Sequence, residues 1–256
     1  MTALRWRWLA SADAPGAEQM AVDAGLMSRA RETGEATFRV YGWTRPTLSF
    51  GRNESVRTRF SPAHLAQHGV DAVRRPTGGR VLLHEGDVTY SITAPASDAE
   101  SVRSAFARLN ALLMAGLAGL GVVVGEASRG RALRPGRDAC FAEPSAGELV
   151  FDGRKLVASA QQRDAGALLQ HGSILVADRQ SRIPALAVAP MADPAPAATL
   201  ELALGRPVTR DEVREALRAA VASERGGVEE LDSAEARDYA APFRSRFSDP
   251  EWTWRR

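Results

Sequence analysis

The sequence of 256 residues is long enough for one large domain or two small ones. Its 45% hydrophobic and 25% charged residues are ordinary values for a soluble protein, and a net charge of +2 is too small to indicate nucleic-acid binding. The single cysteine excludes an internal disulfide framework and a cysteine-based zinc site.

Periodicity and turn residues predict the elements of the first third of the chain. In chain order these are a strand over 4–9, a helix over 16–31, strands over 38–41 and 47–50, and a helix from Ser61 to Gln67. The first residues contain no apolar core of a signal peptide. The longest apolar run, 111–125, is broken by glycine and too short to span a bilayer. We therefore expect a cytoplasmic protein without a membrane partner.

A strand over 70–73 leads into a loop rich in arginine and glycine, Arg74-Arg-Pro-Thr-Gly-Gly-Arg80, and strands over 81–84 and 87–93 follow it. Adjacent glycines allow the backbone to approach a ligand closely, and arginines donate to anions. A glycine hairpin with solvated arginines explains the same residues, so both interpretations stay open on this segment alone. No Gly-Lys-Ser/Thr follows, which excludes a Walker A loop.

The middle of the chain is predicted to contain one long helix and one hairpin. Ser97 and Glu100 resemble a capping box that starts a helix ending near Gly119. A strand over 122–124 follows that helix. The glycines there do not form a dinucleotide-binding fingerprint, which needs a strand before them and a helix after them. Asp152-Gly153 is typical of a tight turn between strands over 148–151 and 155–161.

The last third is predicted to contain a strand over 166–176, a proline- and alanine-rich connector over 183–198, a strand over 199–204 and a helix from a capping box at Thr209 to about Ser223. Aromatic residues in the tail, 235–256, should pack it onto the body. The four histidines include one i, i+4 pair, His64 and His68, but no carboxylate near it suits a metal. We expect no metal site.

Two side chains stand out because each occurs only once. Lys155 is the only lysine among 33 basic residues, and Cys140 is the only cysteine, fifteen residues earlier. Lysine offers a compact ammonium, whereas arginine offers a planar fork that stays charged. A nearby cation lowers the pKa of a thiol and makes cysteine a better nucleophile. The pair therefore suggests covalent catalysis. A buried structural cysteine with a stray surface lysine remains the alternative on composition alone.

Four motifs in order resemble the lipoate/octanoate branch of the biotin/lipoate protein ligase family. They are Arg74-Arg-Pro-Thr-Gly-Gly-Arg-Val-Leu-Leu-His84, Asp87-Val-Thr-Tyr-Ser91, Gly153-Arg-Lys-Leu-Val-Ala-Ser-Ala-Gln161 and Leu169-Gln-His-Gly-Ser-Ile174. The resemblance covers about residues 5–180. It implies an α+β fold with a mostly antiparallel mixed sheet flanked by helices. We expect one catalytic domain over 1–256, with a strand, helix and tail over 199–256 packed onto the core.

The resemblance implies roles for individual residues. Lys155 fits a lysine found at the active centre of both transferases and ligases. Cys140, followed by phenylalanine, is similar to the acyl-thioester nucleophile of ligase-like octanoyltransferases, although some ligases also carry a cysteine there. The acyl-binding residues implied by the motifs are Arg74, Arg75, Thr77, Gly78, Gly79, His84, Ser159, Ala160, Gln161, His171 and Gly172. Ala158 and Glu54 replace a glycine and a glutamine that are usual in the family. The Ala158 methyl should narrow the acyl groove, and Glu54 should disfavour a nucleotide phosphate.

The implied activity is transfer of an octanoyl or lipoyl group from an acyl carrier protein thioester to a lysine of a lipoyl domain. The acceptors would be the glycine cleavage H protein or 2-oxoacid dehydrogenase subunits, and no cofactor would be needed. In the alternative, an ATP-dependent lipoate ligase, Lys155 would contact an acyl-adenylate and ATP and Mg²⁺ would be required. A non-catalytic module that binds acyl carrier or lipoyl domains is a third alternative, but such a module needs neither side chain.

Overall fold

The computed structural model describes residues 4–97, 99–127, 141 and 147–256. Its main feature is an eight-stranded mixed sheet with the order β11-β1-β2-β6-β10-β9-β8-β7. Pairing is parallel from β11 to β2 and antiparallel along the rest of the sheet. The strands are β1 (Trp6–Ala10), β2 (Ala36–Tyr41), β6 (Asp87–Pro95), β7 (Gly125–Glu126), β8 (Leu149–Phe151), β9 (Arg154–Asp164), β10 (Ala167–Leu175) and β11 (Glu229–Glu230).

A second sheet has three strands, in the order β4-β3-β5. Its central strand β3 (Thr47–Phe50) is parallel to β4 (Asp71–Arg74) and antiparallel to β5 (Leu82–His84). Helix α2 (Pro62–Gln67) and the 3-10 helix η1 (Gln180–Leu186) pack on this sheet around Leu48, Phe50 and Ile183. The strands predicted over 38–41 and 47–50 are confirmed, but they belong to different sheets.

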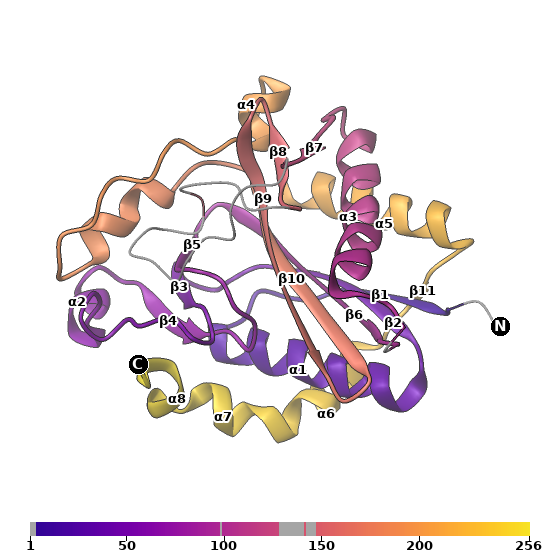
Figure 1. Cartoon of the computed structure of the whole chain (residues 1–256), viewed down its shortest axis with the longest axis horizontal. Helices are drawn as coiled ribbons and strands as arrows, with labels where there is room; N and C mark the ends of the chain where they lie inside the picture. The colour runs from indigo at the N-terminus through magenta and orange to yellow at the C-terminus, as the bar shows by residue number, and fades with distance from the viewer. Residues whose placement is uncertain (1–3, 98, 128–140, 142–146) are drawn as a thin grey trace.

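Helices cover both faces of the large sheet (Figure 1). On one face, α3 (Val102–Gly119) and α5 (Arg210–Arg225) bury Tyr90 and Leu168 against Leu113 and Leu217. On the other face lies α1 (Gly16–Thr33), which is covered in turn by α6 (Ser233–Ala240) and α7 (Arg244–Ser248). The α+β class with a mixed sheet and flanking helices is therefore confirmed.

The tail does pack back onto the body, as the aromatic residues predicted. After η2 (Ala241–Phe243) and α7, helix α8 (Pro250–Trp254) ends beside the small sheet. Phe247 is 2% exposed in the cluster around α1, and the Trp254 ring contacts Phe50 edge-on at 5.4 Å between centroids. The C-terminal residues thus lie against β3, the central strand of the small sheet.

The segment predicted as a strand over 199–204 is a helix, α4 (Leu200–Leu204). The Thr199 hydroxyl accepts from the Leu202 N–H, and Gly205 ends the helix in a left-handed conformation with φ 65°. Alternating leucines suggested a strand, but leucine, alanine and glutamate also favour helix, and the two caps decide the outcome.

Two further boundaries differ from the prediction. Helix α3 is capped by Ser101, whose hydroxyl accepts from the Ser104 N–H at 3.0 Å, and Ser97 instead closes a turn before it. Residues 122–124 do not form a strand, and β7 consists of Gly125 and Glu126 alone. The predicted cap thus lies four residues before the observed one, and the strand predicted over 122–124 is wrong.

Candidate active site

Lys155 is fixed at the start of β9 by a tight hairpin. Asp152 and Gly153 both have positive φ, 49° and 70°, which is the geometry that Asp-Gly favours in a two-residue turn. The turn places Lys155 opposite Val150 of β8. The predicted hairpin is therefore confirmed, and its turn chemistry explains why the lysine lies on a rigid element rather than on a loop.

The Lys155 ammonium forms a buried ion pair with Glu148. Nζ lies 2.7 Å from Oε2, and the two side chains are only 1% and 8% exposed. Glu148 comes just before β8, so the pair ties the two sides of the hairpin together. A buried ion pair is costly unless its geometry is good, and this one is well formed. The site therefore contains an ammonium and a carboxylate held in direct contact.

An aromatic ring completes the surroundings of this ion pair. Phe141 is 2% exposed, and its centroid lies 5.6 Å from Lys155 Nζ. The ring packs with Leu82, Ala158 and Leu175 in a small apolar cluster. Cys140 precedes Phe141 in the sequence but lies outside the described residues. The described part of the site is thus an ion pair beside an apolar wall that includes the Ala158 methyl.

A second group of polar side chains links the arginine–glycine loop to α1 through β10. Thr77 Oγ1 lies 2.6 Å from His171 Nε2, and His171 Nδ1 lies 2.9 Å from Asp23 Oδ2. Asp23 also accepts from Arg39 at 2.7 Å and from the Tyr41 hydroxyl at 3.1 Å. Burial alone would raise the pKa of Asp23, but the His171 hydrogen bond and the Arg39 charge lower it. Asp23 is therefore an ionised carboxylate that orients the imidazole.

A third group connects the same loop to β3, β5 and β6. Arg75 donates to the Ser49 hydroxyl at 2.6 Å, and Ser49 Oγ lies 2.8 Å from His84 Nε2. His84 Nδ1 lies 2.9 Å from Asp87 Oδ2, which also accepts from the Ser173 hydroxyl at 2.6 Å. The Trp43 ring stacks on His84 with centroids 4.0 Å apart. Serine, histidine and aspartate thus form a fully buried relay.

The direction of the hydrogen bonds in this relay follows from the charges at its ends. Arginine only donates, so Ser49 Oγ accepts from Arg75. Burial lowers the pKa of His84 and favours the neutral imidazole. Burial raises the pKa of Asp87, but its contacts with His84 and two hydroxyl groups lower the pKa by more. Asp87 is therefore ionised and accepts a hydrogen bond from the His84 Nδ1–H. Ser49 then donates to Nε2. With every polar group satisfied and buried, the relay holds the loop in place and is closed to a substrate.

Arg75 carries this support to the backbone of the loop. Its guanidinium donates to the carbonyls of Ser49, Gly78 and Arg80 at 2.6, 3.2 and 2.9 Å. Gly78 and Gly79 are exposed at the tip of the loop, and Gly79 has φ 98°. A Cβ on Gly51 would lie 1.9 Å from the Gly79 carbonyl oxygen, so a glycine is needed where the two segments meet. The loop is therefore preorganised around exposed backbone.

Arg74 and Glu54 have framework roles in the same region. Arg74 is fully buried and donates to the carbonyls of Gly51, Glu54 and Thr253. Burial lowers the pKa of Arg74 to about 10. The Glu54 carboxylate accepts from two backbone N–H groups and pairs with Arg59 at 2.7 Å. Because Arg59 neutralises it, there is no longer a reason to expect Glu54 to repel a phosphate.

The motif residues on β9 and β10 are divided between the two faces of the sheet. Ser159 pairs with Gly172, and its hydroxyl lies 2.6 Å from the Tyr90 hydroxyl in the face covered by α3. Gln161 lies on that face too, bonded to Gln170 at 3.2 Å. Ala160 pairs with His171 on the opposite face, beside the Thr77 loop. The structure therefore brings Ala160, His171 and Thr77 together and separates Ser159, Gln161 and Gly172 from them.

Among the described residues, no three His, Cys, Asp or Glu side chains gather as a metal ion would require. Within the same part of the chain, no helix has both the length and the apolar character needed to cross a membrane. His64 and His68 lie on and just after α2, with His68 exposed.

Residues 15–222 match the family model described as the lipoyl protein ligase A/B catalytic domain. This match covers most of the chain and all of the motif residues above.

The chain belongs to this family.

Within the lipoyl protein ligase A/B family, the chain is similar to octanoyltransferases. It is 34% identical to octanoyltransferase LipM from Kyrpidia tusciae, over 98% of this chain and 99% of that protein. It is 38% identical to octanoyltransferase LipM from Carboxydothermus hydrogenoformans, where the alignment covers 67% of this chain and 65% of that protein. The first of these similarities extends through the tail, beyond the residues that the family model matches.

Solved structures of this fold include ligases. A bipartite lipoate protein ligase from Thermoplasma acidophilum superposes with a TM-score of 0.75 at 19% identity, covering 98% of this chain and 96% of that one. A lipoate-protein ligase A bound with ATP superposes with a TM-score of 0.73 at 19% identity, covering 99% of both chains. At this identity the two structures establish the shared fold.

Several residues that organise this family site were not anticipated from the sequence. Glu148 has no motif around it, and Asp23 is one aspartate on a long helix. Both become recognisable only when distant segments come together. Asp87 did carry a signal, since His84-Glu-Gly-Asp87 places an imidazole and a carboxylate on either side of a tight connection.

Proposed function

We propose that the protein transfers an octanoyl group from a carrier-protein thioester to a lysine of a lipoyl domain, through an acyl thioester on Cys140. The enzyme class is an acyltransferase, because the similarity to octanoyltransferases runs along the whole chain. The structural observation that best supports the proposal is the buried Lys155–Glu148 ion pair beside Phe141, the residue that follows the only cysteine.

In the first half-reaction, the Cys140 thiolate attacks the carbonyl carbon of the donor thioester. A new carbon–sulfur bond forms, the bond to the carrier sulfur breaks, and the carrier leaves as its thiolate. A cation favours both sulfur anions: an unpaired ammonium at about 4 Å contributes on the order of 4 kcal/mol at an effective dielectric near 20, and the opposite charge of Glu148 reduces this contribution. Lys155 supplies that cation, and Glu148 holds its ammonium in one orientation.

In the second half-reaction, the acceptor lysine attacks the Cys140 thioester as a neutral amine. The amide bond forms, the cysteine thiolate leaves, and the attacking nitrogen must lose one proton. The ion pair with Glu148 identifies Lys155 as an ammonium, so the carboxylate is the basic member of the pair. We assign the proton to the Lys155–Glu148 pair as a unit, with Lys155 in contact with the reacting atoms and Glu148 as the base behind it.

The Gly78–Gly79 tip is the element best placed to stabilise the oxyanion that forms in both steps. Its backbone is exposed and its conformation is fixed by Arg75. Preorganised backbone N–H groups cost no rearrangement when charge develops on a carbonyl oxygen. Thr77, held by His171 and Asp23, fixes the base of the same loop.

The experiment that tests the proposal compares two acyl sources with one lipoyl-domain acceptor. Octanoyl carrier protein without ATP should modify the acceptor lysine, and free octanoate with Mg-ATP should not. If the opposite pattern appears, with acyl-adenylate formed at a rate comparable to transfer, the protein is an ATP-dependent ligase and the proposal fails.

A further inference from the structure

Five arginines form one continuous surface around the end of the chain. They are Arg52, Arg57, Arg246, Arg255 and Arg256, and four of them are exposed while Arg255 is half-buried. Direct contacts join them. Arg255 donates to the Arg52 carbonyl, and the Arg256 carbonyl accepts from the Arg57 N–H at 3.0 Å. We call these five residues the arginine patch.

The charges of the arginine patch are not neutralised within the described part of the chain. Arginines next to it are paired, Arg59 with Glu54 and Arg244 with Glu18, both at 2.7 Å. None of the five patch residues forms an ion pair with a described carboxylate, not even with the exposed Glu251 on α8 or with Asp249, which caps that helix. Burial first, and then the neighbouring arginines, lower the pKa of Arg246 and Arg255. The fold therefore holds like charges together at a cost.

Aromatic stacking and backbone hydrogen bonds fix the guanidinium groups of the patch. Arg246 and Arg255 both stack on the Trp252 ring, with the guanidinium carbons 3.8 and 3.9 Å from its centroid. Arg57 donates to the Trp254 carbonyl. Stacked guanidinium groups lose less freedom when they bind a carboxylate, and their planar forks match its two oxygens. The patch is thus preorganised for an anionic partner.

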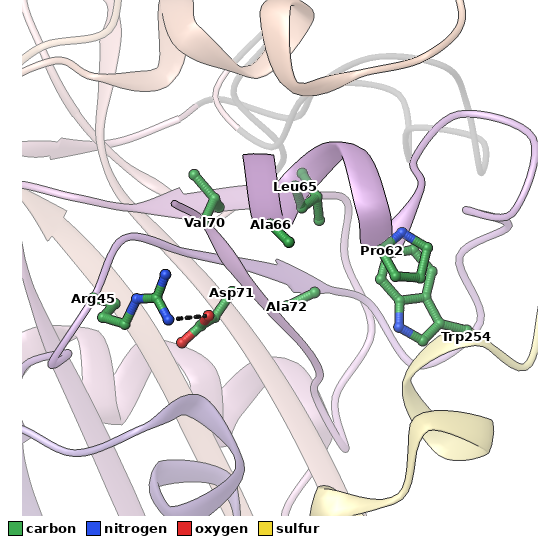
Figure 2. A pocket seen from close by; sticks show the side chains of 8 residues that line it. All are labelled: Arg45, Pro62, Leu65, Ala66, Val70, Asp71, Ala72 and Trp254. Carbon is green, nitrogen blue, oxygen red and sulfur yellow. Dashed lines mark ion pairs between the residues drawn. The ribbon is translucent and has the colours of Figure 1, made fainter. Parts of the chain in front are cut away.

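A pocket of mixed character adjoins the arginine patch. It has a volume of about 240 Å³ and is lined both by apolar side chains and by the Arg45–Asp71 ion pair (Figure 2). The apolar lining residues are Pro62, Leu65, Ala66, Val70, Ala72 and Trp254. Trp254 belongs to the pocket and precedes two arginines of the patch. A pocket of this size accepts one apolar side chain, which is how protein interfaces are commonly anchored.

The patch also borders the loop of the candidate active site. The Arg52 N–H donates to the Thr77 carbonyl at 2.7 Å, one residue before the exposed Gly78–Gly79 tip. In contrast, Figure 1 places α8 at the opposite side of the molecule from the β8–β9 hairpin that carries Lys155. A partner on the patch therefore lies beside the loop, on the side of the molecule away from the β8–β9 hairpin.

We propose that the arginine patch and its pocket are the docking surface for the carrier protein that delivers the acyl thioester, which binds through an acidic face bearing an apolar side chain. This proposal rests on the proposed function. A donor whose thioester lies at the end of a long flexible arm docks away from the reacting atoms, whereas an acceptor must bring its own short lysine side chain to Lys155. Carboxylates on the carrier complement the unpaired arginines and speed its association.

The test uses charge reversal at the exposed rim of the patch, Arg52→Glu with Arg256→Glu, in the full chain. The matched control, Arg103→Glu with Arg237→Glu, changes the net charge equally at two exposed arginines that form no ion pair with a carboxylate of the described residues. Affinity for the pantetheinylated carrier protein, measured by fluorescence anisotropy, should fall at least about tenfold in the patch variant and less than about twofold in the control. Because binding is measured without catalysis, this result stands whether or not the acyl-transfer mechanism is right.

Four further measurements separate this surface from other causes. Transfer from octanoyl-pantetheine, which lacks both protein and phosphate, should be unchanged in the patch variant. A carrier protein with two acidic residues replaced by lysine should regain affinity for that variant. Ala66→Leu, which narrows the pocket, should raise the KM for the octanoyl carrier protein but not the KM for octanoyl-pantetheine. The proposal is overturned by equal binding of both double variants. It is overturned as well by equal losses with octanoyl-phosphopantetheine and the carrier, which would make a phosphate the ligand.

Discussion

Replacement of Glu148 by glutamine tests the ion pair on which the proposed chemistry depends. The substitution keeps the size of the side chain and one acceptor oxygen but removes its charge, and Lys155 is only 1% exposed. At 2.7 Å and an effective dielectric near 20, the attraction is on the order of 6 kcal/mol before desolvation is counted. Measured losses for one partner of a buried pair are about 3–5 kcal/mol, so we expect a loss of that size.

Urea unfolding followed by tryptophan fluorescence measures this loss. With an m-value of about 3 kcal/mol/M, the midpoint should fall by roughly 1–1.7 M in Glu148→Gln. Glu224→Gln, at an exposed position on α5, is the matched control and should stay within about 0.5 kcal/mol of the original protein. The double variant Glu148→Gln/Lys155→Met removes both charges, so it should regain most of the lost stability.

Two results would contradict this expectation for the ion pair. An unchanged midpoint in Glu148→Gln would mean that the pair contributes no net stability. A double variant as unstable as the sum of its parts would mean that packing, rather than an uncompensated charge, explains the loss. Acyl transfer by Glu148→Gln should fall as well, because Lys155 loses the group that orients it and the base behind it.

Lys155→Arg keeps the positive charge but cannot give the same compact contact, so the rate of acyl transfer should fall by at least about two orders of magnitude. The Cys140 thiol of this variant should also be alkylated only at higher pH. Near-native turnover with an unchanged alkylation profile would mean that the single lysine has no special role. Asp23 has a lowered pKa in the folded state, so its contribution to stability is present above about pH 4 and is lost as pH falls further; Asp23→Asn should be less stable at pH 7 and should flatten stability between about pH 5 and 2 in urea titrations. A Cβ at Gly172 would lie 2.2 Å from the Ala158 carbonyl oxygen, so Gly172→Ala should lose about 1–3 kcal/mol in thermal melts, whereas Gly119→Ala, with open space around it, should not.

Local signals predicted the elements whose chemistry lies within a few residues. Asp152-Gly153 gave the β8–β9 hairpin because only a few residue types adopt positive φ at both turn positions. Thr209 and Glu212 gave the start of α5 because both halves of a capping box are present in the sequence. The sequence Leu-Glu-Leu-Ala-Leu of α4 is compatible with both a strand and a helix, and the prediction of a strand from this pattern was wrong.

The site was predicted less completely because its polar groups come from distant segments. Thr77, His171 and Asp23 are separated by 94 and 148 residues along the chain, and no local pattern reports such contacts. The placement of Ser159 and Ala160 on opposite faces of the sheet could be predicted, because side chains of neighbouring residues in a strand point to opposite faces. That separation was available from the sequence once residues 155–161 were predicted to be a strand.

In the proposed mechanism, Cys140 carries the octanoyl group between donor and acceptor. The most direct measurement is the intact mass of the protein after incubation with octanoyl carrier protein and no ATP. We expect the addition of one octanoyl group, which hydroxylamine removes and which is absent in Cys140→Ala. Equal labelling of Cys140→Ala, or transfer to a lipoyl domain without any labelled enzyme, would contradict it.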